Sequence, residues 1–255
     1  MNITLNAVLF ATTLFVGMLA AQEAGLRLGR RRLAEGESAR TGLGAIDGAV
    51  FGLMGLLVAF AFHGAASRFD ARRALVIQEA NDIGTAYLRL DLLPAPAQPK
   101  LRDLFRRYVD TRIEVYHRLP DAASAREALG RADGLQREIW KASVEAARDA
   151  PQATMLLLPA VNAMIDVTTA RTMAIQTHPP LIVFAMLGFL ALACALLAGF
   201  GMAGTTSRSF LHVVGFAAIL TVTVYVILDY EFPRVGIIRL DSADQLLVDA
   251  RASMR

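Results

Sequence analysis

Charged side chains are scarce in this sequence: only 19% of its 255 residues are Asp, Glu, Lys or Arg, whereas 55% are apolar. Soluble domains carry about 25% charged residues, so the composition argues against an ordinary water-soluble fold and favours a membrane protein. The single cysteine, Cys194, lies inside an apolar run. One cysteine excludes a disulfide within the chain and a thiolate metal site, and we interpret Cys194 as a small apolar side chain in a membrane helix.

The common motifs of catalysis and cofactor binding are also missing. The sequence has no P-loop, no G-x-G-x-x-G segment opening a helix, no HExxH and no nucleophile elbow. Its four histidines are far apart along the chain, at His63, His117, His178 and His212. We therefore predict that the protein is not an enzyme and needs no metal or other cofactor.

Basic residues give the chain a formal net charge of +3, and all but two of the 26 are arginine. They lie in the polar segments that border the apolar runs, which is typical of loops next to a membrane. We therefore expect no nucleic-acid partner. The arginines that flank the two sides of the predicted spans are equal in number, so the orientation in the membrane stays open.

Four apolar runs have the length of a membrane span, which needs about 20 residues to cross ~30 Å of hydrocarbon. They cover residues 3–21, 43–66, 181–200 and 210–228. The first run has the alternative of a signal peptide, but no Lys or Arg precedes it and an arginine cluster from Arg27 to Arg32 follows it. A retained span is favoured, and we predict a multi-pass protein of the cell (inner) membrane.

The polar stretch between the second and third spans carries 16 basic and 14 acidic residues over positions 67–178. Apolar residues at helical spacing, with charged pairs on the other side, predict helices at about 100–118, 122–148 and 152–177. Pro159 is expected to kink the last of these or to mark its start. The predicted organisation is all-α: a transmembrane hairpin (1–66), a helical extramembrane domain (67–178), a second hairpin (179–229) and a tail (230–255). A capping box of Ser242 and Gln245 predicts a short tail helix at 243–253.

The second span is predicted to continue unbroken into the polar stretch as one helix of about 50 residues. Small, aliphatic or aromatic residues recur at alternating spacings of four and three, which is the pattern of a packed helix seam. Arg73 is the exception in this apolar seam, which consists of Gly48, Gly52, Gly55, Ala59, Phe62, Ala66, Phe69, Arg73, Val76, Ala80, Ile83, Tyr87 and Leu90. Gly44, Gly48 and Gly52 form a G-x-x-x-G-x-x-x-G run, for which packing within the chain is favoured over a subunit interface.

Several segments resemble one family of bacterial membrane proteins. They are "GAIDGAVFGLMGLLVAFAFHGAASRFDARRALVIQEANDIGTAYLRLDLLP" (44–94), "LLLPAVNAMIDVTTAR" (156–171), "THPPL" (177–181) and "VYVILDYEFPRVGIIRLD" (224–241). Over about residues 40–255 the chain is similar to the bestrophin-like domain family, which has four spans. The name implies a likeness to bestrophins, pentameric anion channels in which the second span lines the pore and extends into a helical domain. The bestrophins' calcium-binding acidic cluster and hydrophobic neck have no match here, so calcium gating is not predicted and no bestrophin site residue is assigned.

The functional prediction is therefore an oligomeric ion channel in the lipid bilayer, with a non-conducting membrane scaffold or sensor as the alternative. The partners expected are other copies of the chain, a pentamer by the resemblance, and chloride or other small anions. If the second spans line a pore, Phe51, Val58 and Phe62 are the candidates for a hydrophobic constriction. Ionisable and polar groups in or near membrane helices are the other candidates: Asp47, His63, Arg73, Glu79, Asn81, Asp82, Asp166, Asp229 and Arg234.

Overall fold

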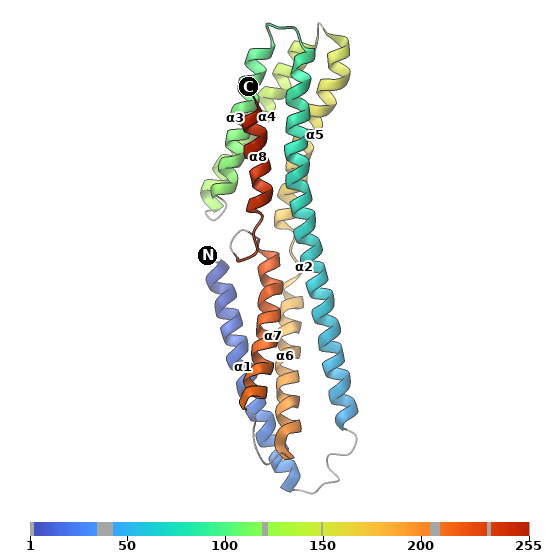
Figure 1. The fold of residues 1–255 in the computed structure, drawn as a ribbon, viewed down its shortest axis with the longest axis vertical. Helices are drawn as coiled ribbons and strands as arrows, with labels where there is room; N and C mark the ends of the chain where they lie inside the picture. The colour runs from blue at the N-terminus through green and yellow to red at the C-terminus, as the bar shows by residue number, and fades with distance from the viewer. Residues whose placement is uncertain are drawn as a thin grey trace. The chain divides into compact units, whose positions relative to one another are not determined.

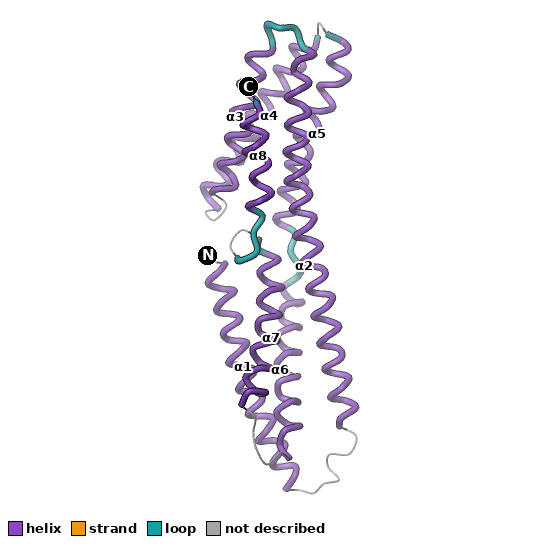
Figure 2. Tube along the Cα trace, in the orientation of Figure 1, coloured by secondary structure: helices purple, strands orange, loops and turns teal. Residues whose placement is uncertain are grey.

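The computed structural model describes residues 3–34, 43–118, 122–148, 150–204, 210–233 and 236–254, which are helical nearly throughout and include no strand (Figures 1 and 2). The all-α prediction is confirmed. The elements in chain order are α1 (Ile3–Ala34), α2 (Leu43–Leu88), η2 (Arg89–Leu92), α3 (Gln98–Arg118), α4 (Ala122–Ala147), α5 (Pro151–Gln176), α6 (Leu181–Gly201), η3 (Met202–Gly204), α7 (Phe210–Glu231) and α8 (Asp241–Ser253).

The four predicted spans fall on α1, the first part of α2, α6 and α7, and four helices are long and apolar enough to cross a membrane. The chain divides into two compact units. The membrane unit comprises Met1–Ser67 and His178–Ile237, and the helical unit comprises Arg68–Thr177 and Ile238–Arg255. Helix α2 contributes to both, because it runs for 46 residues without a break, or about 70 Å at 1.5 Å per residue. The prediction of one long helix across the apolar-to-polar boundary is confirmed.

In the membrane unit, α1 packs closely against α6 through glycines. A Cβ atom on Gly25 would overlap the carbonyl oxygen of Leu196, and one on Gly199 would overlap the carbonyl oxygen of Gln22. One on Gly29 would lie 2.6 Å from the Cβ of Ala203. Such approach of two backbones favours association in lipid, where apolar surface supplies no driving force. The sequence prediction ended this span at residue 21, so it overlooked the small-residue contact that α1 makes farther on.

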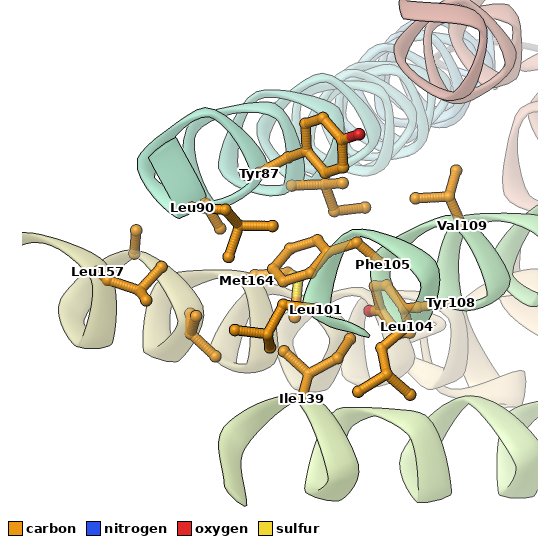
Figure 3. Close-up of a cluster of buried hydrophobic side chains, with 14 of the residues drawn as sticks. Tyr87, Leu90, Leu101, Leu104, Phe105, Tyr108, Val109, Ile139, Leu157 and Met164 are labelled. Atoms are coloured by element: carbon orange, nitrogen blue, oxygen red, sulfur yellow. The ribbon is translucent and has the colours of Figure 1, made fainter. Parts of the chain in front are cut away.

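The helical unit has its own hydrophobic core, to which α2, η2, α3, α4, α5 and α8 all contribute. Figure 3 shows side chains from α2, η2, α3, α4 and α5 pointing toward one another, with Tyr87 and Leu90 facing Phe105. The rings of Tyr87 and Phe105 meet edge to face with centroids 6.0 Å apart, a geometry that aromatic pairs prefer. Full burial of a side chain of this size contributes about 1.5–3 kcal/mol, so this core stabilises the unit.

Two local predictions about these helices are corrected. Pro159 lies inside α5, which begins eight residues earlier at Pro151, so Pro159 does not mark the start of the helix. Helix α8 begins at Asp241 with Leu240 as its N-cap and no side-chain cap hydrogen bond. Position 242 is therefore already helical, so the helix begins two residues before the predicted start at 243 and its N-cap is Leu240 rather than Ser242.

Candidate functional site

The membrane part of α2 presents an open face of small residues. A Cβ atom added at Gly44, Gly48, Gly52 or Gly55 would meet nothing within 4 Å. This helix is also the least covered of the four spans, because only 6% of its most apolar window is buried against 17% to 28% in the others. The prediction that these glycines pack within the chain is wrong for the described residues. No described residue of the chain covers this face.

The three candidates for a constriction do not lie in equivalent surroundings. Phe51 and Val58 are partly buried against the core of the membrane unit, and the ring of Phe51 meets that of Phe216 edge to face at 6.1 Å between centroids. Phe62 is 41% exposed, and its ring and that of Tyr230 on α7 meet edge to face at 5.5 Å between centroids. Phe62 is therefore the candidate with the largest accessible surface.

The polar candidates of this span, Asp47 and His63, lie near its two ends. Asp47 is half-buried and His63 is exposed. They are 16 residues apart on one helix, or about 24 Å, so they do not form a joint site within one chain.

A buried ion triad forms where α2, α3 and α5 meet in the helical unit. Glu79 is 0% exposed, and its carboxylate accepts from Arg112 Nε at 2.6 Å and Nη2 at 3.3 Å and from Arg171 Nη1. Both arginines are below 5% exposed. Burial by itself raises the pKa of Glu79, but the two guanidiniums outweigh it and hold the pKa below its ordinary value. Glu79 is therefore an ionised structural anion rather than a proton donor.

A second buried polar group of side chains lies beside the triad in the same core. Gln136 Nε2 donates to Tyr108 Oη at 3.1 Å and to Thr168 Oγ1 at 3.0 Å, and Thr168 donates to the carbonyl oxygen of Ile165 at 2.7 Å. Burial raises the pKa of Tyr108 well above its ordinary value, so the phenol stays neutral. Buried polar groups with satisfied partners specify how helices pack, and this role fits the whole network.

The arginine that is structurally embedded is Arg72 and not Arg73. Arg72 is 6% exposed, and it donates from Nε to the carbonyl oxygen of Ala174 at 3.0 Å and from Nη2 to that of Thr177 at 2.9 Å. Both carbonyls lie at the carboxyl end of α5, where a cation is favoured. Arg73 is exposed, so its predicted place in the apolar seam is wrong. The seam residues that follow it, Val76, Ala80, Ile83, Tyr87 and Leu90, are all buried.

The remaining candidates of the helical unit lie toward the surface. Asp82 is half-buried and accepts from Gln78 at 2.8 Å, exposed Asp166 accepts from Asn162 at 3.0 Å, and Asn81 is exposed. Each of these hydrogen bonds joins neighbours one turn apart on a single helix. The structure does not bring these three candidates together into a site.

Two buried carboxylates end α7 in the membrane unit. Asp229 is 7% exposed and accepts from the backbone N–H of Ile237 with both oxygens at 3.0 Å. Glu231 is 1% exposed, and its Oε2 lies 3.4 Å from Nδ1 of His178, whose ring stacks on Phe232 at 4.8 Å between centroids. Arg234, also a candidate, lies outside the described residues. Asp229 thus binds the segment that follows α7, and Glu231 binds the segment that precedes α6.

Among the described residues, no group of three or more His, Cys, Asp or Glu side chains is placed to hold a metal ion. The model of the bestrophin-like domain matches residues 7–244, which is nearly the whole chain. The chain belongs to the bestrophin-like family. Its four apolar helices and this membership make it a bestrophin-like membrane protein. No curated protein and no solved structure matches it.

Sequence reasoning found Glu79 but missed its partners. Arg112 is 33 positions and Arg171 is 92 positions away from it in the chain, so no local spacing links the three residues. The sequence offered two weak signals: Arg112 lies among the apolar positions of the amphipathic helix α3, and Arg171 is the single basic residue of the largely apolar helix α5. The contacts of Gly25 with Leu196 and of Gly199 with Gln22 were missed because the first predicted span ended at residue 21, before Gln22 and Gly25.

Proposed function

We propose that this bestrophin-like protein assembles into a homo-oligomeric anion channel, a pentamer by the likeness to bestrophins, in which α2 of each copy lines the path. The observation that supports this is the open glycine face of α2. A membrane helix packs its small residues against another backbone, and the described part of the chain offers none to Gly44, Gly48, Gly52 and Gly55. Copies of α2 around a common axis supply one.

Phe62 is the residue we assign to the narrow part of the path, because it is the most exposed of the three candidates. An apolar ring that narrows a pore closes it by excluding water. The contact of its edge with Tyr230 holds the ring at the end of α7. We place the protein in the inner cell membrane, with chloride or other small anions as the permeant ions.

The test is the conductance of the purified full-length protein in planar bilayers, after its oligomer mass has been measured. We expect anion-selective currents, and a conductance that rises severalfold in Phe62→Ala because the constriction widens. Phe60→Ala is the matched control, since Phe60 is 66% exposed on the same helix and two positions away, on another side. Equal effects of the two substitutions on conductance would show that Phe62 does not form the narrow part of the path.

A second function, a non-conducting scaffold or sensor, is favoured by the helical unit. Its buried ion triad of Glu79, Arg112 and Arg171 joins three helices inside the core, which suits a structural role more than contact with a permeating ion. A confirmed oligomer that passes no current under any ionic condition would leave this as the function.

A further inference from the structure

The side of α1 that faces away from α6 carries a shallow, open groove of about 490 Å³, which no other described element of the chain lines and which the proposed channel does not use. Its lining comes entirely from this helix: Ala20, Glu23, Ala24, Arg27, Leu28 and Arg31. The opposite side of α1, with Leu14, Met18 and Gly25, faces α6 and the core of the membrane unit.

The groove is apolar at one end and cationic at the other. Ala20, Ala24, Arg27 and Arg31 follow one another at steps of four, three and four, which places them on one side of the helix. The two alanines leave a recess because their side chains are short. The two arginines stand one turn apart beyond the recess.

The depth of the two ends matches the layers of a bilayer. From Leu5, where the candidate span begins, 20 residues rise about 30 Å and reach Ala24. The alanine recess therefore lies in the last two turns of the hydrocarbon. Arg27 and Arg31 follow about 4 to 10 Å farther along, where lipid headgroups lie.

The two arginines at the cationic end of the groove differ in how far their charge is already neutralised. Arg27 donates from Nε to Glu23 at 2.9 Å, which partly neutralises it, although its side chain is 74% exposed. Arg31 is exposed and has no ion-pair partner in the described part of the chain. An accessible guanidinium matches the oxygens of a phosphate group, which it binds by paired hydrogen bonds.

We propose that this α1 groove binds one anionic phospholipid, with its phosphate on Arg31 and Arg27 and the upper part of an acyl chain over Ala20 and Ala24. The ligand joins an acidic head to an apolar tail, as the groove joins a cationic rim to an apolar recess. The site is separate from the face of α2 and does not depend on conduction.

The test is native mass spectrometry of the full-length protein in detergent, titrated with phosphatidylglycerol or with phosphatidylcholine of the same acyl chains. We expect tighter binding of phosphatidylglycerol. Arg31→Gln weakens that binding about fivefold, the effect of roughly 1 kcal/mol for one cation near a lipid surface. Glu23→Gln strengthens it, because Arg27 is released.

Two variants distinguish a defined lipid site from general attraction of anionic lipid to the arginines of α1. Ala24→Leu fills the recess without changing the charge, so it weakens binding if the acyl chain lies there. Arg30→Gln removes the same charge as Arg31→Gln from an exposed neighbour outside the groove lining and leaves binding unchanged. Equal affinities for the two lipids, equal effects of Arg30→Gln and Arg31→Gln, or no effect of Ala24→Leu would each overturn the proposal.

Discussion

Removal of the Glu79 carboxylate tests how the helical unit is held together. In Glu79→Ala the guanidiniums of Arg112 and Arg171, both nearly inaccessible, lose their shared anion. Breaking a buried ion pair by deleting one partner costs about 3–5 kcal/mol, because an uncompensated charge stays buried. The total stability of a domain is about 5–15 kcal/mol, so this single change removes a large part of it.

The chain contains a convenient probe for this measurement. Trp140, its only tryptophan, lies on α4 in the helical unit and is 38% exposed. Denaturation of the full-length protein in detergent, followed by Trp140 fluorescence, therefore reports on the unit that contains the triad. Asp82→Ala is the matched control: it removes a carboxylate one turn farther along α2 that is bound only by Gln78 in the described residues. Its expected cost is below about 0.5 kcal/mol.

The stability that the Glu79 carboxylate contributes depends on pH, and the direction of this dependence follows from its pKa. Because the arginines hold the pKa of Glu79 below its ordinary 4.5, the ionised carboxylate stabilises the fold fully above that value. The stabilisation is lost as the pH falls through the lower pKa of the folded state. Glu79→Gln should therefore lose less stability on acidification than the unsubstituted protein does. At pH 7 the variant should be the less stable of the two.

The outcomes that contradict this reasoning are clear. A cost below about 1 kcal/mol for Glu79→Ala, or a cost equal to that of Asp82→Ala, would mean that water reaches the triad. A triple replacement of Glu79, Arg112 and Arg171 by apolar residues of similar size should recover most of the stability, since it leaves no buried charge.

The other predictions concern helix contacts. Gly199→Ala should destabilise the membrane unit by about 1–3 kcal/mol, because its Cβ overlaps the backbone of α1. Gly201→Ala, whose Cβ meets nothing within 4 Å among the described residues, should leave the thermal melt unchanged. Equal melting temperatures of the two variants would refute the close α1–α6 contact. Arg72→Leu should lower the stability followed by Trp140 fluorescence by about 1.5–3 kcal/mol through the lost hydrogen bonds from a charged group. Arg73→Leu should change it by less than about 0.5 kcal/mol, and a reversal of this order would show that Arg73 is the embedded cation.

Much of the fold was predictable because the signals are local. About 20 consecutive apolar residues define a span whatever surrounds them, and the regular spacing from Val76 to Leu90 predicted the buried side of α2 in the helical unit. The candidate residues were less predictable. Adjacent positions on a helix point about 100° apart, so the sequence alone did not distinguish the buried Arg72 from the exposed Arg73.

The sequence by itself determined the four spans, the all-α class, the continuity of α2 and the family, since each follows from composition, periodicity or matching segments. Only the tertiary structure decided which small residues are in contact. Gly25 and Gly199 touch a neighbouring backbone, whereas Gly48 and Gly52 in the more conspicuous motif touch no other helix among the described residues. It also joined Glu79 to arginines 33 and 92 positions away. The physical reason is the same in both cases: a contact depends on what faces a side chain across space, and helical periodicity specifies only the direction in which that side chain points.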